Sequence, residues 1–393
     1  MLKLYRLGYV FVLLIILSSV AIADEKPSFE MNWYGYFKLD GSYDDNLTSH
    51  GNFAMWVNSN QLDQNDEQFN MTANETRFGF NLSGKNYKNV SITGKVEFDL
   101  YAGVSGGTIA ENKAMLQLRH AYFTIQKGNT KLLAGQSWDL ISPLNPSTLN
   151  YPVMWGAGNT GYRRPQVSLW YDAVKDTKTN VTVATGFFRT IGSDLTPTFS
   201  LATGETSEGS DDGTDAGIPS WQGLLDVKHQ FNSGVSLRSG VSTLWGRLKA
   251  ETTLGNSEKY ESWAVIGHLM VSFPANYGFS GEVFSGSNLG SYFGGVLNSN
   301  SVDGVGSSGG WISGWANVSP KVKFTAGYGI DNPSDEDLSA GNRSKNRCLF
   351  GNIRYSFVEQ VTVGFELSNW KTDYIGQDAA ETLRAQTSFI LKF

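Results

Sequence analysis

Apolar and polar residues alternate with a period of two along most of this chain, which is the repeat of a β-strand with one apolar and one polar face. In the segment 90–101, Val90 and every second residue after it are apolar or glycine, and the residues between them are polar. The segments 321–331, 361–370 and 383–393 repeat the pattern. Beyond the N-terminal region the chain carries no sustained apolar stripe at helical spacing. The pattern therefore predicts an all-β protein.

We expect about sixteen strands, an even number, as in bacterial transmembrane barrels. The connections alternate between short turns, such as 85–88 and 232–234, and long polar loops, such as 190–220 and 288–309. Short turns at one rim and long loops at the other are typical of an outer-membrane barrel. The expected strands lie near residues 31–43, 74–84, 90–101, 115–127, 130–138, 166–173, 180–189, 221–231, 235–245, 261–273, 277–286, 310–319, 321–330, 347–357, 361–370 and 382–393.

A closed transmembrane β-barrel accounts for these features. Lipid offers no hydrogen-bond partner to a peptide group, so an open sheet edge in a membrane would leave a row of groups unsatisfied, and closure removes that edge. Strands of about ten residues tilted near 45° span the hydrocarbon, and the alternating segments have that length. A mean hydropathy of -0.25 excludes a helical membrane bundle. The alternative is a soluble β-sandwich, which would bury its apolar faces in one shared core.

The N-terminus has the layout of a secretory signal peptide. Lys3 and Arg6 precede an apolar run, and the small residues Ala21 and Ala23 follow it. We expect cleavage before Asp24, so that residues 1–23 are the signal peptide and 24–393 form the barrel; a membrane anchor would need roughly 20 apolar residues. Cleavage changes the formal net charge from -6 to -8, because it removes two basic and no acidic residues. An acidic exported protein lacks the basic face that a nucleic-acid partner would require.

The C-terminal pattern Phe389-x-Leu391-x-Phe393 resembles the signal that the outer-membrane assembly machinery recognises in Gram-negative barrels. The resemblance implies a location in the outer membrane of a Gram-negative bacterium. It also implies contacts with membrane lipid, lipopolysaccharide and the assembly machinery.

A hairpin further along the chain resembles that of trimeric general-diffusion porins. It comprises residues 119–123, a turn at Gly128-Asn129 and residues 133–138, and it is similar above all to the DcaP-like porins. In those proteins a Gly-Gln-x-Trp run leads into a third external loop that folds inward. The resemblance implies a homotrimer that lets small hydrophilic solutes and ions diffuse passively. Unlike DcaP-like members, this chain has no room before its first strand for an N-terminal coiled-coil extension.

The loop 139–164 is too apolar for an ordinary exposed loop. Its apolar residues are Leu140, Ile141, Leu144, Leu149, Tyr151, Val153, Met154 and Trp155. A sixteen-stranded barrel leaves a wide aqueous channel whose interior can cover such residues. We therefore expect the loop to fold inward and narrow the pore. The alternative is that these residues cap the barrel or pack at a subunit interface.

If the apolar rows face outward, charges of both signs line the channel, where they set ion preference at short range. The candidate lumen and constriction residues are Arg77, Lys95, Glu97, Asp99, Arg119, Gln136, Trp138, Asp139, Arg163, Arg164, Arg238, Arg354 and Arg384. Loop carboxylates across the constriction are the expected partners of five of them: Arg77, Arg119, Arg163, Arg164 and Arg384. A lean toward anionic solutes such as carboxylates rests partly on the DcaP-like resemblance. The alternative for each arginine is a wall salt bridge or a contact to lipid phosphate.

Other functions stay open as alternatives. Some outer-membrane barrels are phospholipases or proteases, and His50 lies near Ser49 and Asp45, although no catalytic motif accompanies any histidine. Receptor or adhesin activity in the long loops is a third alternative. We expect no metal, because the acidic runs 205–215 and 331–337 lack the spacing of a helix–loop–helix calcium site. We expect no cofactor, because no paired CxxC or phosphate-cradling glycine motif is present.

Overall fold

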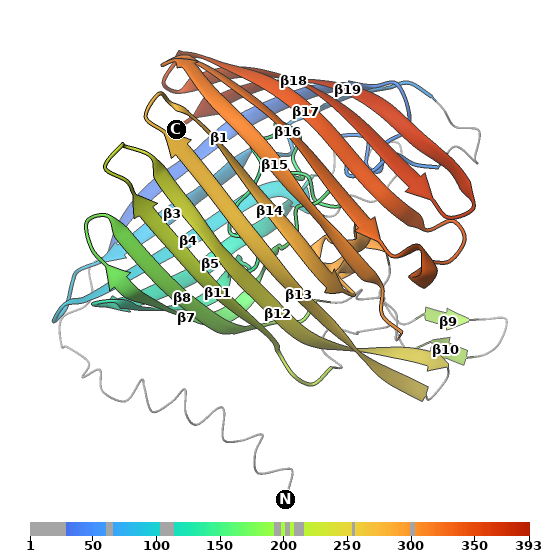
Figure 1. Ribbon diagram of the computed structural model, residues 1–393, viewed down its shortest axis with the longest axis horizontal. Helices are drawn as coiled ribbons and strands as arrows, with labels where there is room; N and C mark the ends of the chain where they lie inside the picture. Colours follow the sequence, from blue (N-terminus) through green and yellow to red (C-terminus); the bar gives the residue numbers. More distant parts are fainter. Residues whose placement is uncertain are drawn as a thin grey trace, which may run out of the picture.

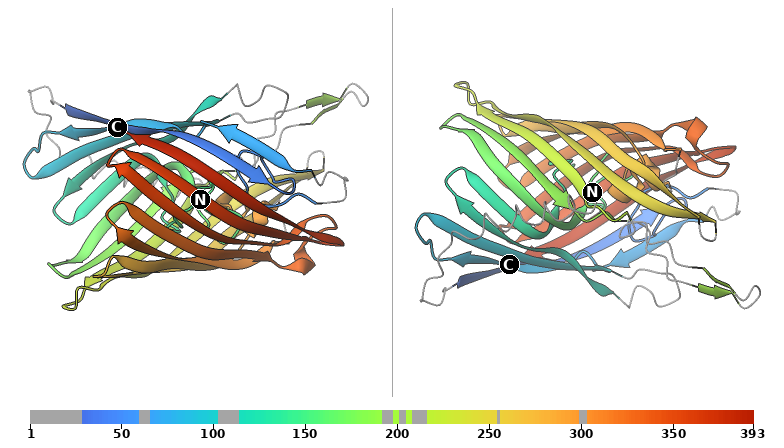
Figure 2. Two further views of the ribbon diagram at one scale, coloured as in Figure 1. Left: turned by 90° about the horizontal axis from the view of Figure 1, so that it is seen from above. Right: turned by 90° about the horizontal axis from the view of Figure 1, so that it is seen from below.

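The computed structural model describes residues 29–59, 66–102, 114–191, 198–200, 205–207, 216–253, 256–298 and 303–393. These residues form a closed antiparallel barrel, in which β1 pairs with β19 on one side and with β2 and β3 on the other (Figures 1 and 2). Because β2 and β3 are two parts of one interrupted strand, the barrel has sixteen strands, as predicted. The expected signal peptide and most of the acidic run 205–215 lie outside the described residues.

The strands have the following bounds. They are β1 (Phe29–Asp44), β2 (Gln68–Thr72), β3 (Arg77–Gly84), β4 (Val90–Ala102), β5 (Met115–Lys127), β6 (Thr130–Trp138), β7 (Arg163–Lys175), β8 (Thr179–Phe188), β11 (Ser220–Gln230), β12 (Ser236–Thr253), β13 (Asn256–Phe273), β14 (Tyr277–Ser287), β15 (Gly306–Ser319), β16 (Val322–Pro333), β17 (Arg343–Val358), β18 (Val361–Tyr374) and β19 (Gln377–Lys392). A separate hairpin, β9 (Thr198–Ser200) and β10 (Glu205–Ser207), lies between β8 and β11. Short 3₁₀ turns are η3 (Gly290–Tyr292), η4 (Gly295–Leu297) and η5 (Asp335–Asp337).

Every predicted strand is present, but some differ in extent. The strand expected at 74–84 is interrupted at residues 73–76, where the Thr76 hydroxyl accepts a hydrogen bond from the Lys38 N–H at 3.2 Å. The stretch 371–381, expected to be a long loop, is instead part of β18 and β19, which meet in a tight turn at residues 375–376. The apolar alternation stops there because polar residues such as Lys371, Asp373 and Glu381 replace the apolar ones, yet the backbone ladder continues.

The apolar rows of the strands face outward and the polar rows face inward. Val283 and Ile312 are 66 % and 55 % exposed on the outer surface, whereas Glu97 and Gln222 inside the barrel are 5 % and 0 % exposed. A β-sandwich would show the reverse, with its apolar rows packed together in a dry core. The sandwich alternative is therefore wrong.

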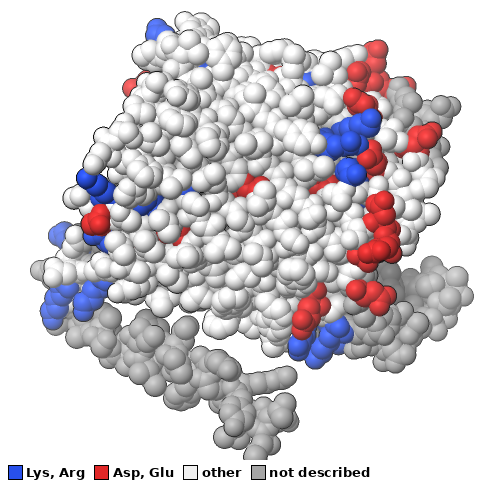
Figure 3. Space-filling model, in the orientation of Figure 1, with Lys and Arg blue, Asp and Glu red and all other residues white. Residues whose placement is uncertain are grey.

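Short turns lie at one end of the barrel, the turn end. The longer connections, together with the tight turn between β18 and β19, lie at the other, the loop end (Figure 1). Figure 3 shows a broad, largely uncharged band between a mostly basic turn end and a mostly acidic loop end. At the turn end, the backbone N–H groups of Thr179 and Lys178 donate to the Asp176 carboxylate and lower its pKa. No helix among the described residues is long and apolar enough to cross a membrane.

The barrel closes through the last residue of the chain. The N–H of Phe393 donates to the carbonyl oxygen of Gly35 and the N–H of Gly35 donates to that of Phe393, both at 3.1 Å. On the outer face, the Phe393 ring lies 5.4 Å from that of Phe37. Phe389, Leu391 and Phe393 all point outward, 54 %, 46 % and 56 % exposed. Their role as an assembly signal stays a prediction.

Substituting Gly35 by valine is expected to destabilise this seam. A Cβ at Gly35 would overlap the carbonyl oxygen of Arg77 and lie 2.6 Å from the Phe393 ring. Overpacking of this kind typically costs about 1–3 kcal/mol. We expect a fall in the urea concentration at which half of the refolded barrel is unfolded. Unfolding is measured by the loss of the heat-modifiable band of the folded barrel on gels. Gly41→Val is the matched control on the same strand, because a Cβ there meets nothing within 4 Å; equal losses in both variants would contradict the prediction.

Candidate pore constriction

The loop of residues 139–162 between β6 and β7, here called L3, enters the barrel and reaches the opposite wall. The Glu282 carboxylate on β14 accepts hydrogen bonds from the Leu144 N–H at 2.9 Å and from the Ser142 hydroxyl. The indole N–H of Trp311 on β15 donates to the same carboxylate at 3.2 Å. The Glu282 carboxylate thus binds groups of the protein itself, and it holds the first part of L3 against the barrel wall.

A second anchor lies on β17 and β18. The Glu366 carboxylate accepts hydrogen bonds from the backbone N–H of Leu149 at 2.6 Å and of the next residue at 3.2 Å. The Arg354 guanidinium donates to the carbonyl oxygens of Ser147 at 3.2 Å and Thr148 at 2.8 Å. A carboxylate therefore binds the N–H groups of this segment and a guanidinium binds its carbonyl groups, which fixes its position against the wall.

The far end of L3 lies directly on the backbone of β15 and β16. Gly158 has φ +105°, and a Cβ on it would overlap the carbonyl oxygen of Gly310 and lie 2.9 Å from that of Ile330. A Cβ at Gly329 would in turn overlap the carbonyl oxygen of Ala157. Such close backbone approach is possible only where side chains are missing on both surfaces. L3 is therefore docked on this wall and does not simply overhang the lumen.

A second loop covers L3 from the loop end. Trp155 of L3 stacks on Phe293, which follows η3, with ring centroids 4.6 Å apart and an interplanar angle of 12°. The Gly161 N–H donates to the carbonyl oxygen of Tyr292 at 2.7 Å. The Arg164 guanidinium lies 4.0 Å from the centre of the Tyr292 ring. These contacts join the two loops into one packed layer across the barrel.

The apolar residues of L3 are covered as the sequence predicts. Leu140, Ile141 and Met154 are 1 %, 1 % and 0 % exposed in the single chain. Their cover comes from the barrel wall and the loop of residues 288–298, with Ile141 in one cluster with Leu244 and Ile266. The expectation that L3 folds inward is confirmed, and these residues need no subunit interface to be buried.

An ion-pair cluster lies on β4 and β5, beside L3. Arg119 Nε is 2.8 Å from Glu97 Oε1, and its Nη1 is 2.5 Å from Asp99 Oδ2. Lys95 Nζ is 3.3 Å from Glu97, and Arg77 Nε is 3.8 Å from it. A β-bulge skips Arg119 in the pairing of β4 with β5, so that this residue and the one after it are both buried inside. The bulge thus places the Arg119 guanidinium beside the two carboxylates of the neighbouring strand β4.

Arg163 is buried next to L3 without a carboxylate partner. It is 2 % exposed, and none of its three side-chain nitrogens has a hydrogen-bond partner among the described residues. Its guanidinium lies 4.8 Å from the centre of the Trp138 ring and 4.5 Å from that of Tyr162. Aromatic faces stabilise a cation but leave its charge uncompensated.

Gln136, also expected in the lumen, instead donates to the backbone carbonyl of Leu118 at 2.6 Å.

The arginines pair mainly with carboxylates of the wall, which corrects the expectation of loop partners. Arg384 Nη1 is 2.7 Å from Asp44 on β1, and Arg238 Nε is 2.8 Å from an Asp226 oxygen on β11. Among the five arginines expected to have loop partners, Arg164 meets a carboxylate of L3, with its Nε 2.8 Å from Asp139. The reason is in the loop itself, because Asp139 is the only acidic residue between 139 and 162.

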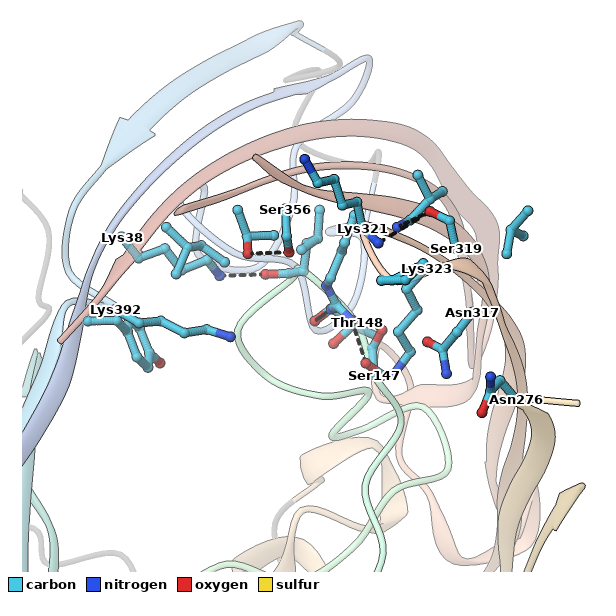
Figure 4. Close-up of a pocket in the computed structure, with 18 of the residues that line it drawn as sticks. Lys38, Ser147, Thr148, Asn276, Asn317, Ser319, Lys321, Lys323, Ser356 and Lys392 are labelled. Carbon is cyan, nitrogen blue, oxygen red and sulfur yellow. Dashed lines mark hydrogen bonds between the residues drawn. The ribbon is translucent and has the colours of Figure 1, made fainter. Parts of the chain in front are cut away.

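A basic cavity of about 950 Å³ lies between L3 and the turn end. Its basic lining residues are Lys38, Lys321, Lys323, Arg354 and Lys392, and its acidic one is Glu75. Figure 4 shows Lys38 and Lys392 entering from one side and Lys323 from the other, with Ser147 and Thr148 of L3 between them. We call this cavity the vestibule.

The sequence interpretation did not single out Lys38, whose ammonium pairs with Glu75 and lies 3.3 Å from Asp40. It also missed Gln222, which accepts from the Leu140 N–H at 2.7 Å and donates to Asp139 at 2.8 Å. Both lie on inward rows of their strands, so the same period-two pattern could have found them.

The structure does not assemble the residues of the enzyme alternative. His50 Nδ1 lies 2.9 Å from the Ser49 hydroxyl, but Asp45 accepts hydrogen bonds from the Thr382 hydroxyl and the Leu383 N–H, both at 2.8 Å. The described residues contain no group of three or more His, Cys, Asp or Glu side chains that could hold a metal ion.

Solved structures with this arrangement are outer-membrane proteins. The outer membrane channel DcaP of Acinetobacter baumannii aligns over 95 % of this chain and 100 % of its own, with a TM-score of 0.69 and 18 % identity. An anion-selective porin from Comamonas acidovorans aligns over 93 % of this chain and 100 % of its own, with a TM-score of 0.57 and 10 % identity. The trimer form of OmpT, an outer membrane protein of Vibrio cholerae, aligns over 93 % of this chain and 100 % of its own, with a TM-score of 0.55 and 12 % identity.

The comparison of sequences gives no such match: no family model and no curated protein matches the chain. The likeness therefore concerns the architecture, which is the closed barrel of sixteen strands with short turns at one end. The chain has the fold of the outer-membrane porins.

Proposed function

We propose that this chain is an outer-membrane porin through which small hydrophilic solutes and ions diffuse passively. The observation that carries the proposal is the anchoring of L3 across a polar barrel interior, by Glu282 on one strand and Glu366 on another. In this function the signal peptide of residues 1–23 is removed, and the barrel of residues 24–393 faces the periplasm with its turn end. The uncharged band contacts lipid, and the rims contact lipopolysaccharide.

We further propose that the pore prefers anions, carboxylates among them. Glu282, Glu366 and Asp331 are buried and accept hydrogen bonds from loop groups, so their charge is screened from solutes by N–H donors. Arg163 and three lysines of the vestibule have no carboxylate partner in the described part of the chain; these lysines are Lys321, Lys323 and Lys392. The charge that meets a solute is therefore mainly positive. The anion-selective porin among the similar structures is consistent with this proposal.

Reversal potentials in planar bilayers test this proposal. With a potassium chloride gradient, we expect the potential to have the sign of chloride preference. A net difference of about 1 kcal/mol between the two ions corresponds to roughly a fivefold permeability ratio. A potential of the opposite sign would remove the anion preference, and a purified protein without any conductance would remove the porin function itself.

A homotrimer is also proposed. The trimer form of one similar structure supports it. Early strands such as β1 present outward rows with Phe37, Leu39 and Gly41, which can pack against a second copy. Chemical crosslinking of the protein in outer-membrane vesicles, followed by electrophoresis, should give a band of three subunits.

A further inference from the structure

We propose that the vestibule is a binding site for a polyvalent phosphate anion, and that the anion blocks the pore when it is bound. The inference rests on the proposed porin function and concerns a cavity of that pore. It goes beyond a general anion preference because it names the place, the chemical group and the side from which the anion enters.

The location follows from the lining of the vestibule. L3 forms its inner limit, through Ser147, Thr148 and Leu149, and the turn at Pro320 lies at its outer limit. The carbonyl oxygen of Leu149 accepts a hydrogen bond from the Lys38 ammonium at 2.9 Å. An anion in this cavity therefore lies directly against the segment that narrows the pore.

The charge of the vestibule is not balanced. Among the residues that the structure describes, Glu75 is the only acidic one that lines it, and Glu75 pairs with the Lys38 ammonium. Lys321, Lys323 and Lys392 form no ion pair with any described carboxylate. Like charges gathered in a cavity with walls of low dielectric raise the local concentration of counter-ions. The vestibule therefore attracts anions of high charge more strongly than monovalent ones.

The chemistry of the free cations favours phosphate over carboxylate. The fork of an arginine guanidinium binds carboxylate and phosphate alike, whereas a lysine ammonium acts as a point charge. A group of ammonium ions therefore binds most strongly the anion with the most charge along its length, and a phosphate chain carries more charge than a small carboxylate. The one arginine of the vestibule, Arg354, already donates to the carbonyl oxygens of Ser147 and Thr148. The groups left for a ligand are the ammonium groups of Lys321, Lys323 and Lys392, together with neighbouring hydroxyls and amides such as Ser356 and Asn317.

Access to the site is one-sided. The vestibule opens toward the turn end, and L3 separates it from the loop end. A large polyvalent anion added at the loop end would first have to pass the layer formed by L3 and the loop of residues 288–298. Block by such an anion should therefore occur from the turn end only.

The experiment is single-channel recording with tripolyphosphate added to one compartment and then to the other. We expect each channel to be blocked from one compartment only, with citrate at equal concentration much weaker. In the variant K323Q/K392Q, the half-blocking concentration should rise at least tenfold. The control is K85Q, since Lys85 is exposed at the turn end but does not line the vestibule.

Several outcomes would overturn the inference: equal block from both sides, equal potency of citrate, or the same half-blocking concentration in K323Q/K392Q as in the native protein. Loss of all conductance would instead remove the porin function. In that case, calorimetric titration of tripolyphosphate into the detergent-solubilised protein still decides the site. Binding that K323Q/K392Q abolishes and K85Q retains would support it, and no binding to the native protein would refute it.

Discussion

Gly158→Val is expected to release L3 from the far wall and to raise the single-channel conductance. Gly158 has φ +105°, and its missing Cβ would overlap the carbonyl oxygen of Gly310. Valine in a left-handed conformation costs about 1–2 kcal/mol, and overpacking adds about 1–3 kcal/mol. A total near 3 kcal/mol lowers the ratio of docked to undocked loop roughly a hundredfold. The conductance should rise, while the anchors at Glu282 and Glu366 keep the first part of L3 inside the barrel.

Gly376→Val is the matched control for this experiment. Gly376 also has a positive φ, +70°, but a Cβ there meets nothing within 4 Å. The control therefore carries the backbone strain of valine without the clash. We expect its conductance in planar bilayers to equal that of the native protein. If both variants conduct like the native protein, the docking of L3 on β15 and β16 does not restrict the pore.

Arg119→Met is expected to destabilise the barrel and to weaken its anion preference. Arg119 is 4 % exposed and binds two buried carboxylates, Glu97 and Asp99. Removing one partner of a buried ion pair typically costs about 3–5 kcal/mol, because the other charge stays buried and uncompensated. The unfolding midpoint in urea should fall, and the reversal potential should shift toward potassium.

The triple variant E97Q/D99N/R119M separates these two effects. Replacing a buried ion network by neutral groups of similar shape is often close to neutral for stability. We therefore expect the triple variant to regain most of the stability that Arg119→Met loses. Its reversal potential should shift toward chloride, the opposite direction to Arg119→Met, since the substitutions remove one more negative than positive charge. A triple variant as unstable as Arg119→Met would show that Arg119 stabilises the barrel by packing rather than by charge.

The strands could be predicted because each one carries its own evidence. In β4, a lipid-facing row and an inward row alternate without interruption, so local sequence is enough to place both faces. The predictions failed where the side chains no longer alternate between apolar and polar although the backbone is still a β-strand. Residues 371–381 lack the alternation of apolar and polar residues, although they continue β18 and β19. A hydrogen-bonded ladder needs no particular side chains there, so the sequence has no signal for it.

The inward folding of L3 could also be predicted, because a loop so apolar needs cover. The partners of the arginines could not. Which carboxylate faces Arg119 depends on the register of β4 and β5 and on one bulge between them. The adjacent polar residues Arg119 and His120 mark the position of that bulge, but only the pairing of the strands shows its direction. The vestibule likewise joins residues from both ends of the chain, Lys38 and Lys392 among them, which no local pattern connects.

Closure of the barrel joins β1 to β19, and Tyr36 faces Lys392 across the seam. Until the final strand is in place, any shorter assembly has two unpaired borders that can recruit foreign strands and aggregate. Contacts between such distant positions also form slowly. A chain of this design therefore keeps two unpaired strand edges for as long as its last strand is missing, and a product that ends before β19 would keep them permanently.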